Sequence, residues 1–428
     1  MKKYKRRHRT GSKLVLGFFL IIVVGAILLQ LPFCLKDDVR LNFLDALFIS
    51  TSAVCVTGLT PLTIADTFAI PGRVVICFLM QLGGIGFAIV AAGFIFLFGK
   101  FLAGKSQLLI KDSLGLETNK EIITIAKRAI IISLIIEVVG AIWLFTVFDN
   151  DYSTTEAIGM SIFHSISAYN NAGLDIIGNS LESYRTNISI NLAITTLIIL
   201  GGMGFLVYSD LLNRRHHRHL LMHTKIVLSA TIFLIVIGTL LHYFGSHMTL
   251  LESYFLSVSA RTAGFDTVPC SDLTPFSRFV TNILMFIGAS PGSTGGGIKT
   301  TTFFTIILTI VSLPRGRDPH AFKRQINKDS IVKEFIILST ALALLIIAMG
   351  ILIVLEPDIA PNFLIFEAIS AFATVGLSCN VTGSLSLASK IVIMLLMFIG
   401  RLGPLTITSL FQYKKERLQF MEERIVTG

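Results

Sequence analysis

Four short stretches of this chain end at or just after a glycine and contain residue types that could hold a cation. Each follows an apolar segment of helix length, passes through a few small or polar residues, and has Leu or Phe directly after the glycine. The four stretches are residues 50–60, 167–174, 259–265 and 370–377. Such a recurrence is typical of one supersecondary unit used several times. Glycine suits this chemistry because it can turn successive main-chain carbonyls toward one axis, at backbone angles that cost other residues about 1–2 kcal/mol.

The composition indicates that this chemistry lies in a membrane. Hydrophobic residues make up 53% of the chain and charged residues only 14%, with a mean hydropathy of +0.77. Soluble domains carry about 25% charged residues, so we predict an integral membrane protein. The five cysteines stand singly, which indicates neither a disulfide framework nor a metal-binding spacing. The net charge of +10 then indicates basic cytoplasmic loops rather than a nucleic-acid partner.

The first repeat is predicted over residues 14–100, after a basic cytoplasmic tail at 1–13. Its first span is Leu14–Leu31; a signal peptide is the alternative, but the run is long and no small-residue cleavage site follows. Asn42–Ser52 is too short to span and is typical of a re-entrant segment, and Val74–Phe98 spans back. The unit is therefore helix, half-helix, extended loop, helix.

The same unit can be laid down three more times along the chain. Repeat 2, at 122–213, has the segments 129–148, 155–167 and 190–212. Repeat 3, at 222–314, has the segments 226–244, 250–259 and 279–313, the last broken at 288–297. Repeat 4, at 330–412, has the segments 331–355, 363–370 and 391–411, and a cytoplasmic tail follows at 413–428. We therefore predict an all-α membrane protein of four covalently linked helix–pore loop–helix repeats around a pseudo-fourfold axis, with eight membrane spans and four re-entrant half-helices.

The distribution of charge predicts the orientation of these repeats. The segments that join one repeat to the next are basic, whereas the segments inside each repeat are poor in Lys and Arg. Under the positive-inside bias, both termini lie in the cytoplasm and every half-helix enters from outside. Two spans per repeat give all four the same direction, which excludes inverted repeats.

Four half-helices around one axis would form a pathway for a cation. Irregular backbone at membrane depth is tolerated where it lines a wet cavity. The C-terminus of each half-helix would bring partial negative charge toward the axis, and the carbonyls beyond it could replace the hydration shell of the ion. For a single glycine, a turn or a packing contact is an equal alternative. Four copies in register with four half-helices favour the pathway.

These stretches resemble the Trk/Ktr/HKT superfamily of potassium transporters, and specifically its Ktr-type membrane subunit, over nearly all of the chain from Leu14. The resemblance is carried by the four glycine stretches and by two further segments, 288–301 and 398–404. It implies one pore within a single chain, with K+ bound at Gly58, Gly173, Gly264 and Gly376. The two extra N-terminal helices of Trk-type subunits are absent, which favours the Ktr type.

The resemblance also implies the residues of the selectivity filter. These are Val56, Thr57, Gly58, Asn171, Ala172, Gly173, Thr262, Ala263, Gly264, Thr374, Val375 and Gly376. We expect K+ to be held by the main-chain carbonyls of Thr57, Asn171, Thr262 and Thr374. In some plant relatives a serine at the position of Gly58 accompanies Na+ preference, so the glycine favours K+. A role for Na+, including symport, stays open, as does a Na+-selective relative.

A glycine-rich break in the third repeat is predicted to be a gate below this filter. Its residues are Gly288, Pro291, Gly292, Gly295, Gly296, Gly297 and Lys299. A phosphate-binding loop is disfavoured because the lysine comes one residue too late and the flanks are membrane-like. A simple helix kink is the other alternative. The family has an intramembrane gating loop at this point.

Arg401 lies inside the last predicted span, where a charge is costly and usually faces a wet pathway. We expect it to face the pore near the glycine-rich loop and to form an electrostatic barrier, as an arginine at this place does in the family. A structural pairing with a carbonyl or an acid is the alternative. Glu137 is interpreted as a buried structural partner, His164 as packing behind the filter rather than a catalytic base, and Arg214–His219 as a basic linker rather than a metal site.

The predicted function is K+ translocation across a bacterial plasma membrane, without enzymatic activity. A secondary transporter of an organic solute is a less favoured alternative, because it would need a midplane pocket and inverted repeats. An intramembrane enzyme is disfavoured because no polar catalytic pair is found. By resemblance, we expect a homodimer embedded in membrane lipid and resting on a cytoplasmic ring of nucleotide-binding regulatory (RCK-type) subunits. The C-terminal Arg424–Gly428 resembles the tail that the family places at the dimer interface.

Overall fold

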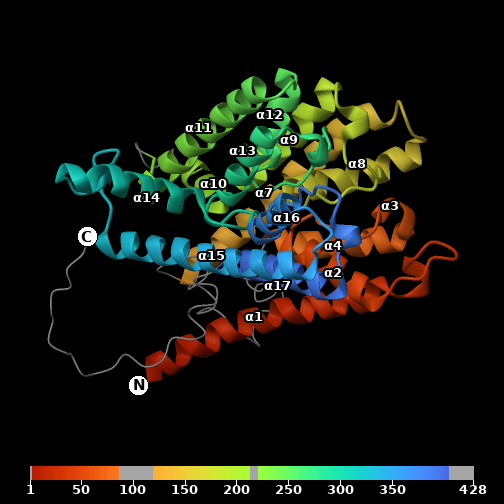
Figure 1. The fold of residues 1–428 in the computed structure, drawn as a ribbon, viewed down its shortest axis with the longest axis horizontal. Helices are drawn as coiled ribbons and strands as arrows, with labels where there is room; N and C mark the ends of the chain where they lie inside the picture. The colour runs from red at the N-terminus through yellow and green to blue at the C-terminus, as the bar shows by residue number, and fades with distance from the viewer. Residues whose placement is uncertain (1, 86–118, 213–219, 404–428) are drawn as a thin grey trace.

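A computed structural model describes residues 2–85, 119–212 and 220–403, and these residues are mostly helical (Figure 1). The helices of the first half are α1 (Lys2–Leu29), α2 (Phe43–Cys55), α3 (Ile64–Thr67), α4 (Ile70–Ile85), α7 (Asn119–Phe148), α8 (Thr154–Tyr169), α9 (Ile188–Gly202) and α10 (Phe205–Leu212). Those of the second half are α11 (Met222–Gly245), α12 (Leu250–Ser259), α13 (Pro275–Phe286), α14 (Thr300–Ser312), α15 (Lys328–Leu355), α16 (Pro361–Ala373) and α17 (Leu387–Leu402). One antiparallel hairpin, β1 (His320–Ala321) with β2 (Arg324–Gln325), joins α14 to α15.

Four short helices, α2, α8, α12 and α16, form the centre of the molecule. Each packs against the long helix before it in the chain, namely α1, α7, α11 and α15. The helix that follows each short helix also packs against the next short one, in the pairs α4–α8, α9–α12 and α13–α16. The series closes because α17 packs against α2, so the last helix of Figure 1 lies beside the first of the short helices.

Local sequence explains where the short helices begin. The side chain of Asn42 accepts a hydrogen bond from Leu44 N at the start of α2. Thr249 and Glu252 form a capping box at the start of α12. Pro361 stands at the first position of α16, where a missing N–H costs nothing. Three of the four short helices therefore have a local start signal, whereas Ser153 at the start of α8 makes no side-chain capping hydrogen bond. The predicted half-helix at 250–259 coincides with α12.

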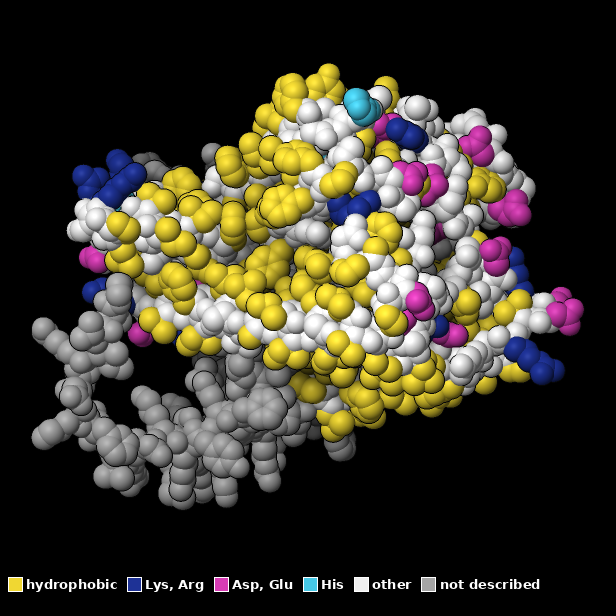
Figure 2. Space-filling view, viewed as in Figure 1, with side chains coloured by type: hydrophobic (Ala, Val, Ile, Leu, Met, Phe, Trp, Pro, Cys, Tyr) yellow, Lys and Arg dark blue, Asp and Glu magenta, His cyan; other side chains and the backbone are white. Residues whose placement is uncertain are grey.

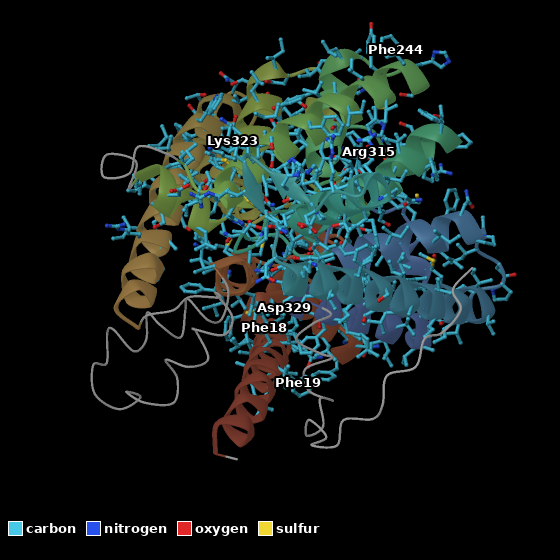
Figure 3. The ribbon with its side chains drawn as sticks, turned by 90° about the vertical axis from the view of Figure 1, so that its left-hand side faces the viewer. Phe18, Phe19, Phe244, Arg315, Lys323 and Asp329 are labelled. Atoms are coloured by element: carbon cyan, nitrogen blue, oxygen red, sulfur yellow. The ribbon has the colours of Figure 1, made fainter. Side chains whose placement is uncertain are left out.

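The outer surface is that of a membrane protein. Figure 2 shows hydrophobic side chains over the broad middle of one face and charged side chains toward its two ends. Neighbouring residues on α1 show how sharply the helices divide inside from outside: Phe18 is 6% exposed and Phe19 is 53% exposed. Figure 3 shows both on α1, with Phe244 at the end of α11, 80% exposed. Such apolar exposure is stable against lipid rather than water.

Span by span, the described helices match the expected pattern in part. Three of them, 128–148, 222–245 and 328–355, are long and apolar enough to cross a bilayer, and α9 with α10 makes a fourth if this bent pair is one span. The break predicted in the last span of the third repeat is present, because α13 and α14 are separated by residues 287–299. The count of eight spans stays a prediction. The ends of the spans predicted at 74–98 and 391–411, the Arg214–His219 tract and the tail at 413–428 lie wholly or partly outside the described residues.

One prediction about a span is wrong. Residues 190–212 were expected to be continuous, but α9 and α10 meet at a bend of 87°. The bend falls at Met203 and Gly204, and Gly204 has a φ of +90°. A helix cannot continue through that angle, and Gly204 tolerates it because it has no Cβ.

Candidate ion pathway

The four glycines of the recurring stretches lie against one another in a closed ring. A Cβ added to Gly58 would lie 3.3 Å from Cα of Gly173, and one added to Gly173 would lie 2.8 Å from Cα of Gly264. One added to Gly264 would lie 3.0 Å from Cα of Gly376, and one added to Gly376 would lie 2.8 Å from Cα of Gly58. All four have positive φ, between +63° and +103°. No other residue type would fit this ring without moving the backbone.

The carbonyls that meet this ring come from the residue before each glycine. They belong to Thr57, Ala172, Ala263 and Val375, and each lies against the glycine of a neighbouring stretch. One residue earlier, Val56, Asn171, Thr262 and Thr374 all have positive φ, from +51° to +83°. Of the carbonyls expected to hold the ion, only that of Thr57 therefore belongs to the layer at the glycines. Those of Asn171, Thr262 and Thr374 come from the preceding layer, and their counterpart in the first stretch is Val56.

Sequence analysis missed the residues that hold these loops in place. One fully buried serine near the end of each short helix bonds the loop that follows it, and the four are Ser52, Ser167, Ser259 and Ser370. The signal was present, because the second serine of a Ser-x-Ser pair recurs in the first three helices and the fourth has Ala-Ile-Ser at 368–370. We name these four the clamp serines.

The glycine-rich segment 287–299 lies directly beneath the ring. A Cβ on Gly295 would overlap Oγ1 of Thr262, and a Cβ on Gly296 would overlap Oγ1 of Thr374. The Asn171 side chain bonds Thr262 Oγ1 at 3.1 Å. Within the described residues, the Oγ1 atoms of Thr57 and Thr374 have no hydrogen-bond partner. The segment therefore touches the same side chains that stand below the ring.

The bend between α9 and α10 supports the opposite side of this segment. Ser290 N donates to Gly202 O at 3.2 Å, and Phe205 N donates to Gly292 O at 2.8 Å. A Cβ on Gly204 would lie 2.7 Å from Pro291 O. The bend between α9 and α10, which was not predicted, therefore packs against the predicted break at 287–299.

Two cationic side chains bond carbonyls of this segment. Arg401 donates to Thr294 O and, in α4, to the carbonyls of Gly83 and Gly84. Lys299 Nζ donates to Gly295 O at 2.7 Å and to Gly296 O at 3.3 Å. The structure thus places Arg401 beside the glycine-rich segment, and its partners are carbonyls, as in the structural alternative. The hydrogen bond from Arg401 to Thr294 O is therefore consistent with both interpretations of this residue, a position beside the glycine-rich segment and a structural pairing with a carbonyl.

A cavity of about 460 Å³ opens on the other side of the glycine ring. It is lined by all four glycines and by the carboxylates of Asp175, Glu182 and Asp266. Burial raises the pKa of Asp266 to about 7, and the neighbouring Glu182 and Asp175 carboxylates add to this rise, while a hydrogen bond with Ser180 opposes it. Burial and the carboxylates of Asp272 and Asp175 raise the pKa of Glu182. The mouth of the pathway is therefore acidic and polar.

The other polar candidates have structural partners. Glu137, 6% exposed, accepts hydrogen bonds from Gln81 at 3.1 Å and from Asn170 at 3.1 Å. His164 is fully buried among aromatic rings, and its Nδ1 lies 2.7 Å from Met160 O. Across the described ranges, no group of three or more His, Cys, Asp or Glu side chains could hold a metal ion. All five cysteines are free thiols.

Apolar helices around a ring of main-chain carbonyls define a helical membrane protein. The chain belongs to the TrkH family of cation transport proteins, which matches residues 1–244 and 227–421. Its resemblance to the Ktr-type membrane subunit is confirmed by the relatives described next.

Two relatives carry this assignment, and one solved structure shows the same fold. The chain is 35% identical to Ktr system potassium uptake protein B of Bacillus subtilis, over 97% of this chain and 96% of that protein. It is 33% identical to the potassium/sodium uptake protein NtpJ of Enterococcus hirae, over 100% of this chain and 99% of that one. The crystal structure of the potassium transporter TrkH from Vibrio parahaemolyticus has the same fold, with a TM-score of 0.75 at 20% identity, covering 95% of this chain and 85% of that one.

Proposed function

We propose that this chain is the K+-translocating membrane subunit of a Ktr-type potassium uptake system. The observation that carries the proposal is the closed ring of Gly58, Gly173, Gly264 and Gly376, with one carbonyl from each loop against it. Main-chain carbonyls in this arrangement can replace the hydration shell of a monovalent cation. The names of both relatives include potassium uptake, and that of NtpJ adds sodium.

The proposal includes four helix–pore loop–helix repeats around a pseudo-fourfold axis, at 14–100, 122–213, 222–314 and 330–412. It is supported by the cyclic packing of α2, α8, α12 and α16, each of which contacts the helix that follows the short helix before it. Each repeat would contribute a three-residue loop that ends in its glycine, and the ion would pass between the four loops. Both termini would lie in the cytoplasm, and the acidic cavity would open to the outside.

The gate would be the segment 288–297 together with Lys299 and Arg401. In this arrangement two protein cations occupy carbonyls directly below the glycine ring, where a permeating ion would otherwise be received. Movement of the segment away from Thr262 and Thr374 would clear the pathway. Such movement could be driven from outside the chain, through a homodimer and a cytoplasmic ring of nucleotide-binding subunits; the Ktr system names of the relatives support a multi-component assembly.

A Na+-permeable relative is the second candidate, because NtpJ is named for uptake of both potassium and sodium. Rb+ uptake into liposomes that hold the purified protein, with K+ or Na+ as competitor, separates the two. Competition by K+ at far lower concentration than by Na+ supports the first candidate, and equal competition supports the second. An absence of Rb+ uptake by folded wild-type protein would contradict both candidates.

The variant Gly58→Ser tests the ring itself. Its φ is +103° and an added Cβ would lie 2.8 Å from Ala172 O, so the side chain must widen the ring. We expect Na+ to compete better in this variant. Gly178→Ser is a matched control, because Gly178 has a φ of +113° and also lines the cavity, but its added Cβ would meet nothing closer than 3.6 Å.

A further inference from the structure

The clamp serines bond their loops in two different ways. In all four loops the N–H before the glycine is held by the main-chain oxygen of the clamp serine, at 2.8 or 2.9 Å. The side chains then diverge. Those of Ser52 and Ser370 accept a hydrogen bond from the glycine N–H, whereas those of Ser167 and Ser259 donate to the carbonyl that follows the glycine.

The first arrangement fixes the direction of a carbonyl in the ring. Gly58 N donates to Ser52 Oγ at 3.0 Å, and Gly376 N donates to Ser370 Oγ at 3.0 Å. A peptide unit is planar and trans, so its C=O points opposite to its N–H. An N–H turned back toward the serine therefore turns the carbonyl of Thr57 or Val375 forward, which is where the structure finds each one, against a neighbouring glycine.

The second arrangement fixes a different peptide. Ser167 Oγ donates to Leu174 O at 2.7 Å, and Ser259 Oγ donates to Phe265 O. These carbonyls lie one residue beyond the glycine and point back from the axis into the short helix. These bonds hold the rim of the cavity, which Leu174 lines. In these two loops the serine side chain does not bond the glycine N–H; in the third loop Gly264 N donates instead to the main-chain oxygen of Ser259, at 3.4 Å.

We infer that Ser52 and Ser370 are positioning residues for ion selectivity. Ser167 and Ser259 position the rim of the cavity and have little effect on selectivity. The inference rests on the proposed function, because it concerns the same ring. Selectivity depends on how stiffly the carbonyls keep their spacing, and the two serines stiffen two of the four. The filter is thus built of two unlike halves.

The chain contains matched controls for this inference. Ser50, Ser165 and Ser257 stand two residues before a clamp serine and are fully buried. Their hydroxyls donate to Ile22 O, Glu137 O and Ile235 O in the long helices, at 2.6 to 2.9 Å, and not to the loops. The corresponding residue of α16 is Ala368. Alanine is therefore tolerated at that position in one helix, whereas all four helices have a serine at the clamp position.

The experiment measures Rb+ uptake into liposomes and its competition by K+ and by Na+, for the full chain and for serine-to-alanine variants. Ser52→Ala and Ser370→Ala are expected to reduce the preference for K+ over Na+ by about tenfold, equivalent to about 1.4 kcal/mol. Ser167→Ala and Ser259→Ala are expected to raise the Rb+ concentration that gives half-maximal uptake, with the preference changed less than about twofold. Ser50→Ala and Ser165→Ala should leave the preference unchanged.

The outcomes separate this inference from the proposed function. Wild-type protein that does not prefer K+ over Na+ would overturn the proposed function. Wild-type preference retained in Ser52→Ala and Ser370→Ala, or lost equally in all four clamp variants, would overturn the inference alone. If an alanine variant does not fold, Ser52→Cys and Ser370→Cys serve instead, because the thiol, although larger, fills the site of the hydroxyl and is a weak acceptor. Their preference must then fall between wild type and no preference for the inference to stand.

Discussion

Lys390 in α17 lies 2.8 Å from Asp45 in α2, and this ion pair joins residues 345 positions apart in the chain. Both side chains are largely buried, at 13% and 18% exposure. The pair stands at the contact where the last helix meets the first short helix, so it helps close the circuit of helices around the glycine ring.

Asp45→Asn is therefore expected to destabilise the protein, by about 1–3 kcal/mol, because a cation that is mostly shielded from water loses its partner. Thermal unfolding of the purified protein in detergent measures the effect as a lower Tm. Glu156→Gln is the control, because Glu156 is exposed at the start of α8 and its carboxylate accepts a hydrogen bond from Ser153 Oγ at 2.7 Å. This change should cost less than about 1 kcal/mol. An equal loss for both variants would contradict the closing role of Asp45.

Arg401→Ala is expected to increase Rb+ uptake. The variant removes charged hydrogen bonds that join Thr294 in the glycine-rich segment to Gly83 and Gly84 in α4. Such bonds are worth about 1.5 kcal/mol or more, so the ratio of open to closed pathway should rise about tenfold.

The control for Arg401 is Arg73→Ala. Arg73 also bonds main-chain carbonyls, those of Ala65 in α3 and of Phe68 just after it, but at the opposite end of α4. Liposome flux should rise in the first variant and not in the second. Unchanged or lower uptake in Arg401→Ala would mean that the guanidinium holds the structure together rather than closes the pathway.

Gly296→Ala is expected to raise uptake while preserving the preference for K+ over Na+. Its Cβ would overlap Thr374 Oγ1, so the segment must move down from the ring. Gly350→Ala is a control, because no atom lies within 4 Å of the position that its Cβ would take. Flux and ion competition are measured together. A lost preference in Gly296→Ala would show that this segment forms part of the filter.

Uptake is expected to fall by about twofold as the external pH is lowered from 8 to 6. The pKa of Asp266 is raised to about 7, so its carboxylate is charged above that pH and neutral below it. Loss of negative charge from the cavity mouth lowers the local cation concentration. Asp175 and Glu182 face the same cavity, which limits the size of the effect.

Asp266→Asn should flatten this pH dependence and keep uptake near its value at low pH. Rb+ uptake into liposomes at a fixed internal pH, with the external pH varied, measures it. A variant with the wild-type slope would assign the dependence to another group.

The sequence predicted those parts of the fold that depend on local pattern. The short apolar segment 250–259, the glycine of each loop and the break before Lys299 all lie where they were expected. Each of these features can be predicted from residue types alone, because it depends on the length and polarity of a segment or on a glycine without a Cβ.

The parts that could not be predicted depend on peptide orientation. Val56, rather than Thr57, is the counterpart of Thr262, and each has positive φ two residues before its glycine. Counting back from the glycines gives the same pairing, so the sequence contains this register but not the direction of each carbonyl. In the same way, Ser52 and Ser167 are both serines, and only the turn of the following peptide decides that one accepts and the other donates.

Because a single polypeptide supplies four unlike loops to one ring, each quadrant can be altered without touching the other three. A channel assembled from identical chains cannot be edited in this way, since every substitution is repeated around its axis. One donor side chain, one probe or one extra methyl group could therefore be introduced on a chosen side of the ion. The contribution of each loop to ion selectivity can therefore be measured separately, in variants of a single gene.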